Sequence, residues 1–329
     1  MRLELRFISA AEVEAALPMR AAIDAMKRAF VLLSADEVEM PPRTAIEAPK
    51  RGGNLLFMPA YAAADDRYSV KVVSLFAGNP ARGLPLIQSI VTLFDGVTGR
   101  PLAVIDGTSL TALRTGAASG AATETLARED AAIVAIFGAG AQARTQLEAV
   151  CAARRITLAR VYTPEAALGE RFAREMSFRL GIEIVAAKEP REALVGAAVV
   201  CTATVSGTPV FDDRDLEPGT HINAIGSYKP ERREIPGSTA ARSRIFVDHR
   251  DSARAEAGDL LIPLREGLIR GDEEWTELGE VIAGRRPGRA SPDEITLFKS
   301  VGVAIQDLVG AEAVLAGAER LGLGTMVQL

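Results

Sequence analysis

The segment from residue 133 to residue 143 restricts the fold of this chain more than any other part. Apolar residues at 134–137 (VAIF) lead directly into a glycine-rich turn at 138–143 (GAGAQA), and a helical pattern follows at 142–152. A strand, a tight glycine turn and a helix N-terminus form a site for a pyrophosphate, because glycine lets the backbone approach and the first helical N–H groups favour negative charge. Ala143 replaces the third glycine, which this motif accepts. The alternative is a tight turn without a ligand.

Strands and helices alternate from residue 131 onward. We expect helices at 142–152 and 166–180, and strands at 133–137, 160–163, 182–187, 198–203, 221–225 and 244–248. Such alternation is typical of a parallel sheet with helices on its faces. The sequence therefore predicts an α/β fold whose main part is a Rossmann-like, doubly wound sheet.

The pattern of the first hundred residues is different. Two helices are expected within 9–34, and strands at 54–60, 69–76, 86–95 and 101–105. The turn at 96–99 predicts an antiparallel hairpin between the last two strands. Thr108 or Ser109 can cap a helix that runs to about Leu126, and a long amphipathic helix should cover 301–321. At 329 residues two domains are expected: a smaller α+β domain (1–113 with 303–329) and a Rossmann-like domain (114–302).

Composition excludes several functions. The formal net charge is −5 and no basic run stands out, so we expect no nucleic acid partner. The sequence has neither a bilayer-spanning apolar stretch nor the apolar core of a signal peptide, which predicts a cytoplasmic protein that does not bind membranes. Cys151, Cys201, His221 and His249 are the complete supply of Cys and His, in no metal-binding spacing, so no metal is expected. Acid–base chemistry must then depend on Lys, Asp, Glu, Tyr or a cofactor.

The end of the second strand of a Rossmann fold usually indicates which dinucleotide is bound, because an acidic residue there contacts the 2′-hydroxyl of the adenosine ribose. Thr163 occupies this place, and it is neither the Asp typical of NAD nor an Arg suited to a 2′-phosphate. Glu165 is close, but it can equally begin the next helix. The expected cofactor is NAD(P)H, with its phosphate preference open.

Several separated motifs follow one another along nearly the whole chain. They are MPPR at 40–43, the strand around Lys71, DGT at 106–108 leading to LRTGA at 113–117, the glycine turn, NAIG at 223–226 and KSVG at 299–302. Together they resemble the ornithine cyclodeaminase/mu-crystallin family, which includes cyclodeaminases, archaeal-type alanine dehydrogenases, reductases of cyclic imino acids and an NADPH-binding crystallin. The resemblance implies a homodimer whose first domain carries the substrate and dimer contacts and whose second domain binds the dinucleotide.

The resemblance also implies roles for individual residues. Arg43 and Lys71 look like the groups that hold a substrate carboxylate, and Val301 falls near the substrate. Arg114 looks like a cofactor or carboxylate contact at the domain junction. Positions similar to the family's cofactor contacts are Thr92, Arg114, Thr115, Gly138, Gly140, Ala141, Gln142, Thr163, Thr204, Gly226 and Ser300.

The chemistry of Arg43 and Lys71 is compatible with these roles. Arg43 follows two prolines, and a rigid loop suits a guanidinium that grips a carboxylate at two points; the alternative is a solvated loop arginine. Lys71 shares a strand face with Val73 and Leu75. Such neighbours would lower the pKa of its ammonium toward a range useful for proton transfer. The alternative is a lysine that protects a sheet edge.

Tyr228 is the main departure from the family pattern. The family's cyclodeaminases and archaeal-type alanine dehydrogenases have an Asp at its place, and cyclodeamination needs a base to activate an amine or water. A reductase needs a hydride donor, a carboxylate clamp and a proton source. Arg43, NAD(P)H and Lys71 can supply these, with Tyr228 or water assisting; alternatively Tyr228 only packs on the nicotinamide or the substrate.

The leading hypothesis is therefore an oxidoreductase that reduces a cyclic imino acid, such as pyrroline-2-carboxylate or piperideine-2-carboxylate, with NAD(P)H. The first alternative is an ornithine cyclodeaminase or an alanine-dehydrogenase-like amino acid dehydrogenase. The second, from another class, is a crystallin-like protein that binds NADPH without turnover.

Overall fold

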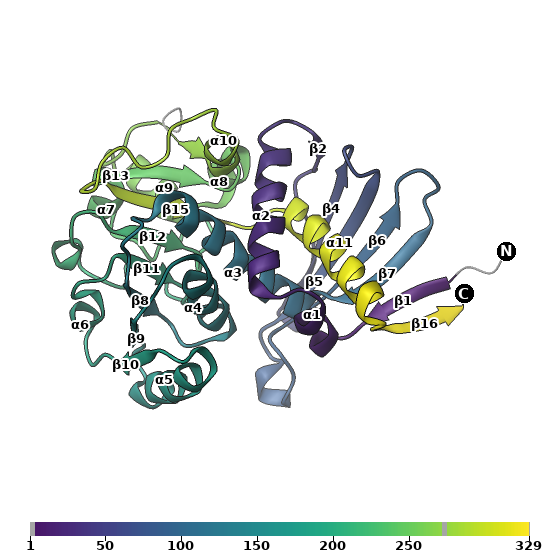
Figure 1. The fold of residues 1–329 in the computed structure, drawn as a ribbon, viewed down its shortest axis with the longest axis horizontal. Coiled ribbons are helices and arrows are strands. Elements are labelled where there is room, and N and C mark those ends of the chain that lie inside the picture. Colours follow the sequence, from purple (N-terminus) through teal and green to yellow (C-terminus); the bar gives the residue numbers. More distant parts are fainter. Residues whose placement is uncertain (1–3, 272–274, 329) are drawn as a thin grey trace. The chain divides into compact units, whose positions relative to one another are not determined.

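The computed structural model describes residues 4–271 and 275–328. The chain separates into two compact units. Unit 1 consists of Met1–Arg114 and Val303–Leu329, and unit 2 of Thr115–Gly302. Figure 1 labels most elements of the two units, which are described separately below.

The sheet of unit 2 is parallel throughout its described strands. Its order is β10-β9-β8-β11-β12-β15-β13-β14. The strands are β8 (Ile133–Phe137), β9 (Leu158–Tyr162), β10 (Glu183–Ala186), β11 (Val199–Thr202), β12 (His221–Ala224), β13 (Ser243–Val247), β14 (Thr276–Glu277) and β15 (Ile295–Lys299). The chain winds outward from β8 through β9 to β10, and in the other direction through β11 to β12. This is the order in which a Rossmann fold reverses its winding.

Helices cover both faces of this sheet because successive strand residues point to opposite sides. Val134 and Ile136 of β8 pack with α4 (Ala141–Ala153) and α5 (Ala166–Leu180). Ala135 and Phe137 belong to a second core cluster on the other face. That cluster includes residues of α6 (Pro190–Leu194), α7 (Gly237–Arg242), α8 (Arg250–Glu256) and α9 (Gly258–Arg265), and α10 (Leu278–Ile282) follows β14. The predicted doubly wound sheet is confirmed.

Unit 1 is built on a mostly antiparallel sheet of order β16-β1-β7-β6-β5-β4-β2, with β3 also paired to β4. Its strands are β1 (Glu4–Ile8), β2 (Val38–Glu39), β3 (Thr44–Ala48), β4 (Gly53–Ala62), β5 (Arg67–Phe76), β6 (Ile87–Asp95), β7 (Pro101–Asp106) and β16 (Thr325–Gln328). The predicted hairpin is the antiparallel pair β6–β7. The pair β1–β7 is parallel.

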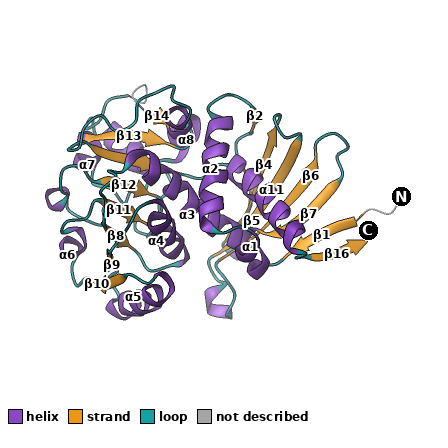
Figure 2. Cartoon of the chain, in the orientation of Figure 1, coloured by secondary structure: helices purple, strands orange, loops and turns teal. Residues whose placement is uncertain are grey.

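Three helices of unit 1 lie on one face of this sheet, as Figure 2 shows: α1 (Ala10–Ala16), α2 (Met19–Leu33) and α11 (Ala304–Leu321). Ile23, Met26 and Phe30 of α2 are completely buried. On the covered face of β6, Val91 and Leu93 are also buried, whereas Ile90 on the opposite face is 49% exposed. Unit 1 therefore has one buried sheet face and one open, largely apolar face.

The boundaries of two helices differ from those expected. The helix α3 (Gly107–Leu126) begins in unit 1 and continues into unit 2. Asp106, and neither Thr108 nor Ser109, caps it, because the Asp106 carboxylate accepts from the backbone N and the hydroxyl of Ser109 at 2.7 and 2.6 Å. The C-terminal helix starts at Ala304 rather than at residue 301.

Candidate active site

Two predicted substrate-binding cations meet at one buried carboxylate in unit 1. Lys71 lies in β5 with 2% of its surface exposed, and its Nζ is 2.6 Å from Oδ2 of Asp307 in the first turn of α11. Arg114 of α3 donates from its Nε to Oδ1 of the same carboxylate at 3.1 Å. Another Arg114 nitrogen donates to the side-chain oxygen of Gln306 at 2.5 Å. Asp307 therefore bridges two cations that come from a strand and a helix far apart in the sequence.

The charges in this cluster affect the protonation of Lys71. Burial is the largest cause and lowers the pKa of the Lys71 ammonium, to about 8, while Asp307 opposes this shift. The positive charges of Arg114 and Arg43 lower the same pKa further, so Arg43 also lies within electrostatic reach. Burial alone would raise the pKa of Asp307, but Arg114 and Lys71 outweigh burial and lower it. Among these groups the cations outnumber the carboxylate, which suits an anionic ligand.

Thr92 does not join this cluster. In the β5–β6 register Lys71 pairs with Val91, and Thr92 pairs with Val70. Paired residues share a sheet face and neighbouring residues alternate. Thr92 therefore lies on the face of the unit 1 sheet opposite to Lys71.

The predicted dinucleotide contacts of unit 2 gather at one edge of its sheet. Gly138, Thr163, Thr204, Gly226 and Ser300 follow β8, β9, β11, β12 and β15, respectively. These strands are parallel, so their carboxyl ends meet at the same edge. The sheet reverses its winding at β8, and ligands of open α/β sheets bind beyond the strand ends at such a point.

The turn after β8 has the geometry of an anion site. Gly138 has a φ of +106°, and a Cβ there would lie 2.5 Å from the carbonyl oxygen of Ala203. Gly140 is the N-cap of α4, and a Cβ added to it would meet nothing within 4 Å. Ala141 and Gln142 form the first turn of α4, and the side-chain oxygen of Gln142 is buried without a hydrogen-bond partner among the described residues. Open space in front of a helix N-terminus fits a pyrophosphate.

Thr115 connects this turn with α3. Its backbone carbonyl accepts a hydrogen bond from the Gln146 side chain of α4 at 3.2 Å. A Cβ on the neighbouring Gly116 would lie 2.4 Å from the carbonyl oxygen of Thr145. The small residues after Arg114 therefore allow α3 and α4 to pack with their backbones close together.

Arg144 is a residue of this site that the sequence motifs did not identify. It donates to the carbonyl oxygens of Ala139 and Gly140 at 2.8 and 3.1 Å, and it forms two hydrogen bonds with the Glu175 carboxylate. It thus fixes the carbonyl side of the glycine turn. Its position in the first turns of α4, directly after the glycine motif, was the available signal.

Glu234 is a second residue that sequence reasoning missed. Its carboxylate accepts hydrogen bonds from the Thr202 hydroxyl (3.0 Å), the Thr204 N and hydroxyl (2.7 and 2.6 Å) and the Gly226 N (2.8 Å). Burial, followed by the charge of Asp259, raises its pKa. Two predicted cofactor contacts, Thr204 and Gly226, therefore share one buried acceptor. An acidic residue in a loop gives no sequence signal of such burial.

Asp259 and Lys299 hold the segment that carries Glu234. Asp259 accepts from the backbone N of Glu234 and of Ile235 at 2.6 and 3.0 Å, and it forms an ion pair of 2.8 Å with Lys299. Lys299 also donates to the carbonyl oxygen of Ser227. Tyr228 follows Ser227 and is 37% exposed. The backbone is thus held at Ser227 before Tyr228 and at Glu234 after it, while Tyr228 itself stays partly exposed within unit 2.

Ser300 and Val301 are held by another buried acid. The Ser300 hydroxyl and the backbone N–H groups of Val301 and Gly302 donate to one oxygen of Asp248 at 2.7, 2.9 and 2.8 Å. The Val301 side chain belongs to a core cluster of unit 2. Asp248 thus fixes the backbone of residues 300–302, which directly follow β15.

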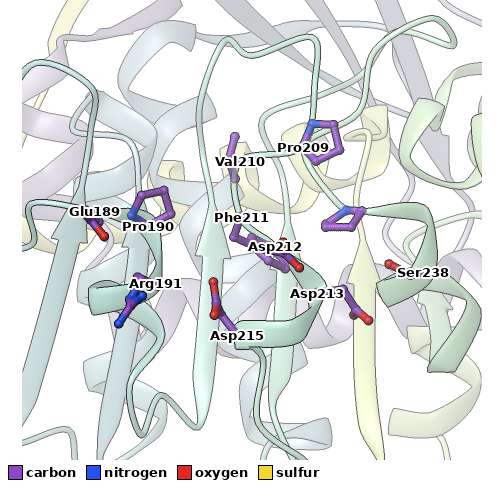
Figure 3. Close-up of a pocket in the computed structure, with 11 residues that line it drawn as sticks. Glu189, Pro190, Arg191, Pro209, Val210, Phe211, Asp212, Asp213, Asp215 and Ser238 are labelled. Carbon is purple, nitrogen blue, oxygen red and sulfur yellow. The ribbon is translucent and has the colours of Figure 1, made fainter.

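A hollow of about 550 Å³ on unit 2 is not built from the predicted site residues (Figure 3). Two of its acidic groups form ion pairs: Asp213 pairs with Arg242, and Asp212 pairs with Arg214. The residues that line it are Glu189, Pro190, Arg191, Pro209, Val210, Phe211, Asp212, Asp213, Asp215, Pro236 and Ser238.

Two of the scarce Cys and His side chains, Cys201 and His221, are completely buried in unit 2. His221 is buried between Thr296 and Asn223, and burial is the main cause that lowers its pKa to about 3. Burial raises the pKa of the Cys201 thiol to about 12. Within residues 4–271 and 275–328, no three His, Cys, Asp or Glu side chains are grouped to hold a metal ion. The helices in that part of the chain are all too short or too polar to cross a membrane.

Two reductases and a dehydrogenase are similar to this chain in sequence or in structure. A Delta(1)-pyrroline-2-carboxylate reductase of Bacillus cereus is 38% identical over 274 residues, which cover 83% of this chain and 84% of that protein. The structure of Thermococcus litoralis Delta(1)-pyrroline-2-carboxylate reductase in complex with NADH and L-proline has a TM-score of 0.92 and 41% identity, covering 97% of this chain and 99% of that one. An archaeal alanine dehydrogenase dimer with bound NAD has a TM-score of 0.91 and 35% identity, covering 99% of both chains.

The match to a family model extends over nearly the whole sequence. Residues 4–320 match the model of the ornithine cyclodeaminase/mu-crystallin family. The resemblance recognised in the sequence motifs is thereby confirmed, and this chain belongs to the ornithine cyclodeaminase/mu-crystallin family.

Proposed function

We propose that this protein is an NAD(P)H-dependent oxidoreductase that reduces the C=N bond of a cyclic imino acid of the pyrroline-2-carboxylate or piperideine-2-carboxylate type. The observation that carries the proposal is the buried cluster in which Lys71 and Arg114 pair with Asp307 while Arg43 acts on the charge of Lys71, because it offers excess positive charge and a lysine of low pKa. The Bacillus and Thermococcus reductases, 38% and 41% identical to this chain, support the same reaction.

Different residues of unit 1 bind the substrate carboxylate and donate the proton. Arg43 and Arg114 orient the substrate carboxylate, since guanidinium groups hold carboxylates at two points. Lys71 contacts the carboxylate and donates a proton to the ring nitrogen, then regains one from water. The bound cofactor supplies the hydride that the imine carbon accepts. The carboxylate clamp contributes chiefly by orientation, because hydride transfer requires the reacting carbon at near-contact distance.

The residues of unit 2 would hold the cofactor. Its pyrophosphate would lie at Gly138, Gly140 and Ala141, where the helix N-terminus opens onto free space. The remaining proposed contacts follow the strand ends or lie nearby, and Arg114 and Thr92 complete the set expected from the family. The proposed unit 2 contacts are Thr115, Gln142, Thr163, Thr204, Gly226 and Ser300.

Tyr228 supports a reductase over a cyclodeaminase. Deamination of ornithine needs a base for an amine or water, and a phenol is a poor base near neutral pH. Imine reduction consumes a proton and needs no such base. We assign Tyr228 to the reaction as an accessory proton donor or as a packing surface for the substrate, with Val301 nearby.

We further propose that unit 1 carries the dimer contacts of a homodimer and that the protein is cytoplasmic. The open face of the unit 1 sheet exposes Phe7, Tyr68 and Ile90 at 41%, 43% and 49%. Exposed apolar patches of this kind commonly mark protein interfaces. The archaeal relative of 35% identity is an alanine dehydrogenase dimer.

A turnover panel with purified protein tests the proposed reaction. NADH or NADPH oxidation would be followed with pyrroline-2-carboxylate, with piperideine-2-carboxylate, and with pyruvate plus ammonia; ammonia release from ornithine would be measured in parallel. We expect oxidation with a cyclic imino acid and little ammonia from ornithine. Ammonia release without imine reduction would make the protein a cyclodeaminase. Binding of NADPH without any turnover would indicate a crystallin-like role.

A further inference from the structure

We propose that Asp307 is the positioning residue of the substrate site: one oxygen of its carboxylate holds the Lys71 ammonium and the other holds the Arg114 guanidinium. This inference rests on the proposed function, because it assigns the residue that orders the carboxylate clamp. Asp307 itself contacts neither substrate nor cofactor in the proposal. It acts through the two cations.

Both oxygens of the Asp307 carboxylate are occupied by the two cations. Its side chain is completely buried, and its two oxygens lie 2.6 Å from Lys71 Nζ and 3.1 Å from Arg114 Nε. The carboxylate stands in the first turn of α11, where the helix dipole favours negative charge. The neighbouring Gln306 accepts from Arg114, which fixes the guanidinium at a second point. The first turn of α11 therefore sets where both cations point.

The electrostatic consequence concerns the charge of Lys71. Burial, Arg114 and Arg43 all disfavour the ammonium, and Asp307 is the group that favours it. With Asp307 present, the pKa of Lys71 is about 8, so the side chain is mainly protonated at pH 7. Without Asp307, only burial and the two arginines would act on Lys71, and its pKa would fall further. A neutral amine neither attracts a carboxylate nor donates a proton readily.

A purely structural role predicts different behaviour. Ile305, Leu308 and Val314 of α11 are buried, so the helix has apolar packing independent of the ion pair. Buried ion pairs generally add little net stability, although removing one partner is costly. Lys299 and Asp259 form another buried pair, in unit 2, with nearly the same burial and a similar distance of 2.8 Å. Asp259→Asn is therefore a matched control for the loss of a buried carboxylate.

Lysine-selective NMR tests the proposal directly. The chain has only six lysines, Lys27, Lys50, Lys71, Lys188, Lys229 and Lys299. The Lys71 side-chain signal, assigned by its loss in Lys71→Arg, would be titrated in the wild type, in Asp307→Asn and in Asp259→Asn. We expect Asp307→Asn to lower the Lys71 titration midpoint by at least about one pH unit, as the loss of a close opposite charge does. Asp259→Asn should leave that midpoint in place. An unchanged Lys71 midpoint in folded Asp307→Asn would overturn the proposal.

Kinetics provide the second measurement and separate this inference from the proposed function. In the wild type kcat/KM for the imino acid should fall as pH rises through the Lys71 midpoint, and Asp307→Asn should move this fall to lower pH. The substrate has the same pKa in both experiments. A difference between the two pH profiles therefore reports a change in the protonation of the protein. If the NMR midpoint moves while the kinetic profile does not, the positioning role stands and the assignment of Lys71 as proton donor fails.

A second variant covers the case in which Asp307→Asn does not fold. Asp307→Glu keeps the charge but moves the carboxylate by one methylene. We expect a Lys71 midpoint close to that of the wild type together with a KM raised at least about tenfold, because the two cations are displaced from the clamp geometry. A wild-type KM in Asp307→Glu would contradict the positioning role.

Discussion

Gly138 and Gly140 stand two residues apart in one turn, but their surroundings differ. Gly138 has a left-handed backbone, and a side chain there would collide with the carbonyl of Ala203. The fold itself therefore requires glycine at 138. Gly140 has an ordinary backbone conformation, with φ of −83°, and open space beside it. Packing within the described residues does not explain a glycine at 140, whereas a closely approaching ligand does.

Gly140→Leu tests this difference. The leucine side chain would fill the space in front of the helix N-terminus. We therefore expect the NADH dissociation constant to rise at least about tenfold, which is a loss of about 1.4 kcal/mol of binding free energy. The loss of a glycine N-cap should cost helix stability no more than about 1 kcal/mol. Isothermal titration calorimetry would measure the affinity, and urea unfolding the stability.

Gly78→Leu is the matched control for this experiment. Gly78 also has open space within 4 Å and no left-handed backbone. The Gly78→Leu protein should bind NADH with the affinity of the wild type. Unchanged affinity in folded Gly140→Leu would mean that the turn has only a structural role.

Residues that act through long-range partners were the hardest to identify from the sequence. Lys71 and Arg114 belong to recognisable motifs, but Asp307 is separated from Arg114 by 193 positions. Its neighbours in the chain suggest only an amphipathic helix. Glu234 is similar, since its acceptor role arises where the ends of β11 and β12 approach each other. The motifs therefore indicated Lys71, Arg114, Thr204 and Gly226, but not the buried carboxylates that bind them in the structure.

At the scale of elements, buried strands with clear turn signals were predictable. The strand at 133–137 and the helix at 166–180 have the bounds expected from their periodicity. The strand β15 was not predicted, although all five of its residues are buried, because it contains the polar Thr296 and ends in the charged Lys299. The edge strand β16 was missed for the opposite reason: its residues are all exposed, and only pairing with β1 makes them a strand.

The loops after β11 and β12 give a prediction at this scale. Glu234→Ala removes the shared acceptor of the partly buried N–H groups of Thr204 and Gly226. A fully buried N–H left unpaired costs about 1–3 kcal/mol, so that range is an upper bound for each of them. We expect a lower urea midpoint and weaker NADH binding, because both loops lose their common anchor. Asp212→Ala makes the same charge change at an exposed ion pair with Arg214, where little effect is expected. NADH affinity equal to the wild type in Glu234→Ala would show that the carboxylate supports only the fold.

At the scale of the whole molecule, the sheet of unit 1 raises the question of assembly. One face is covered by α1 and α11, with α2 packed on α11, and the other presents Phe7, Val70 and Ile90 from three different strands. The strand register places these residues on the same side of the sheet. Sequence periodicity alone cannot predict this register, because β1 and β6 do not pair directly and are connected only through β7. A monomer would leave this face in water, which is unfavourable for a large apolar patch.

Ile90→Glu tests whether the open face is the contact between two copies of the chain. Ile90 lies near the middle of the sheet, between β5 and β7, and is 49% exposed in the single chain. A buried carboxylate on each side of a symmetric contact would be strongly unfavourable, so sedimentation equilibrium should give a dimer for the wild type and mainly monomer for the variant. Phe178→Glu introduces the same charge at a residue of α5 that is 95% exposed, and it should remain dimeric. If Ile90→Glu sediments as a dimer with the wild-type dissociation constant, this face does not hold the two chains together.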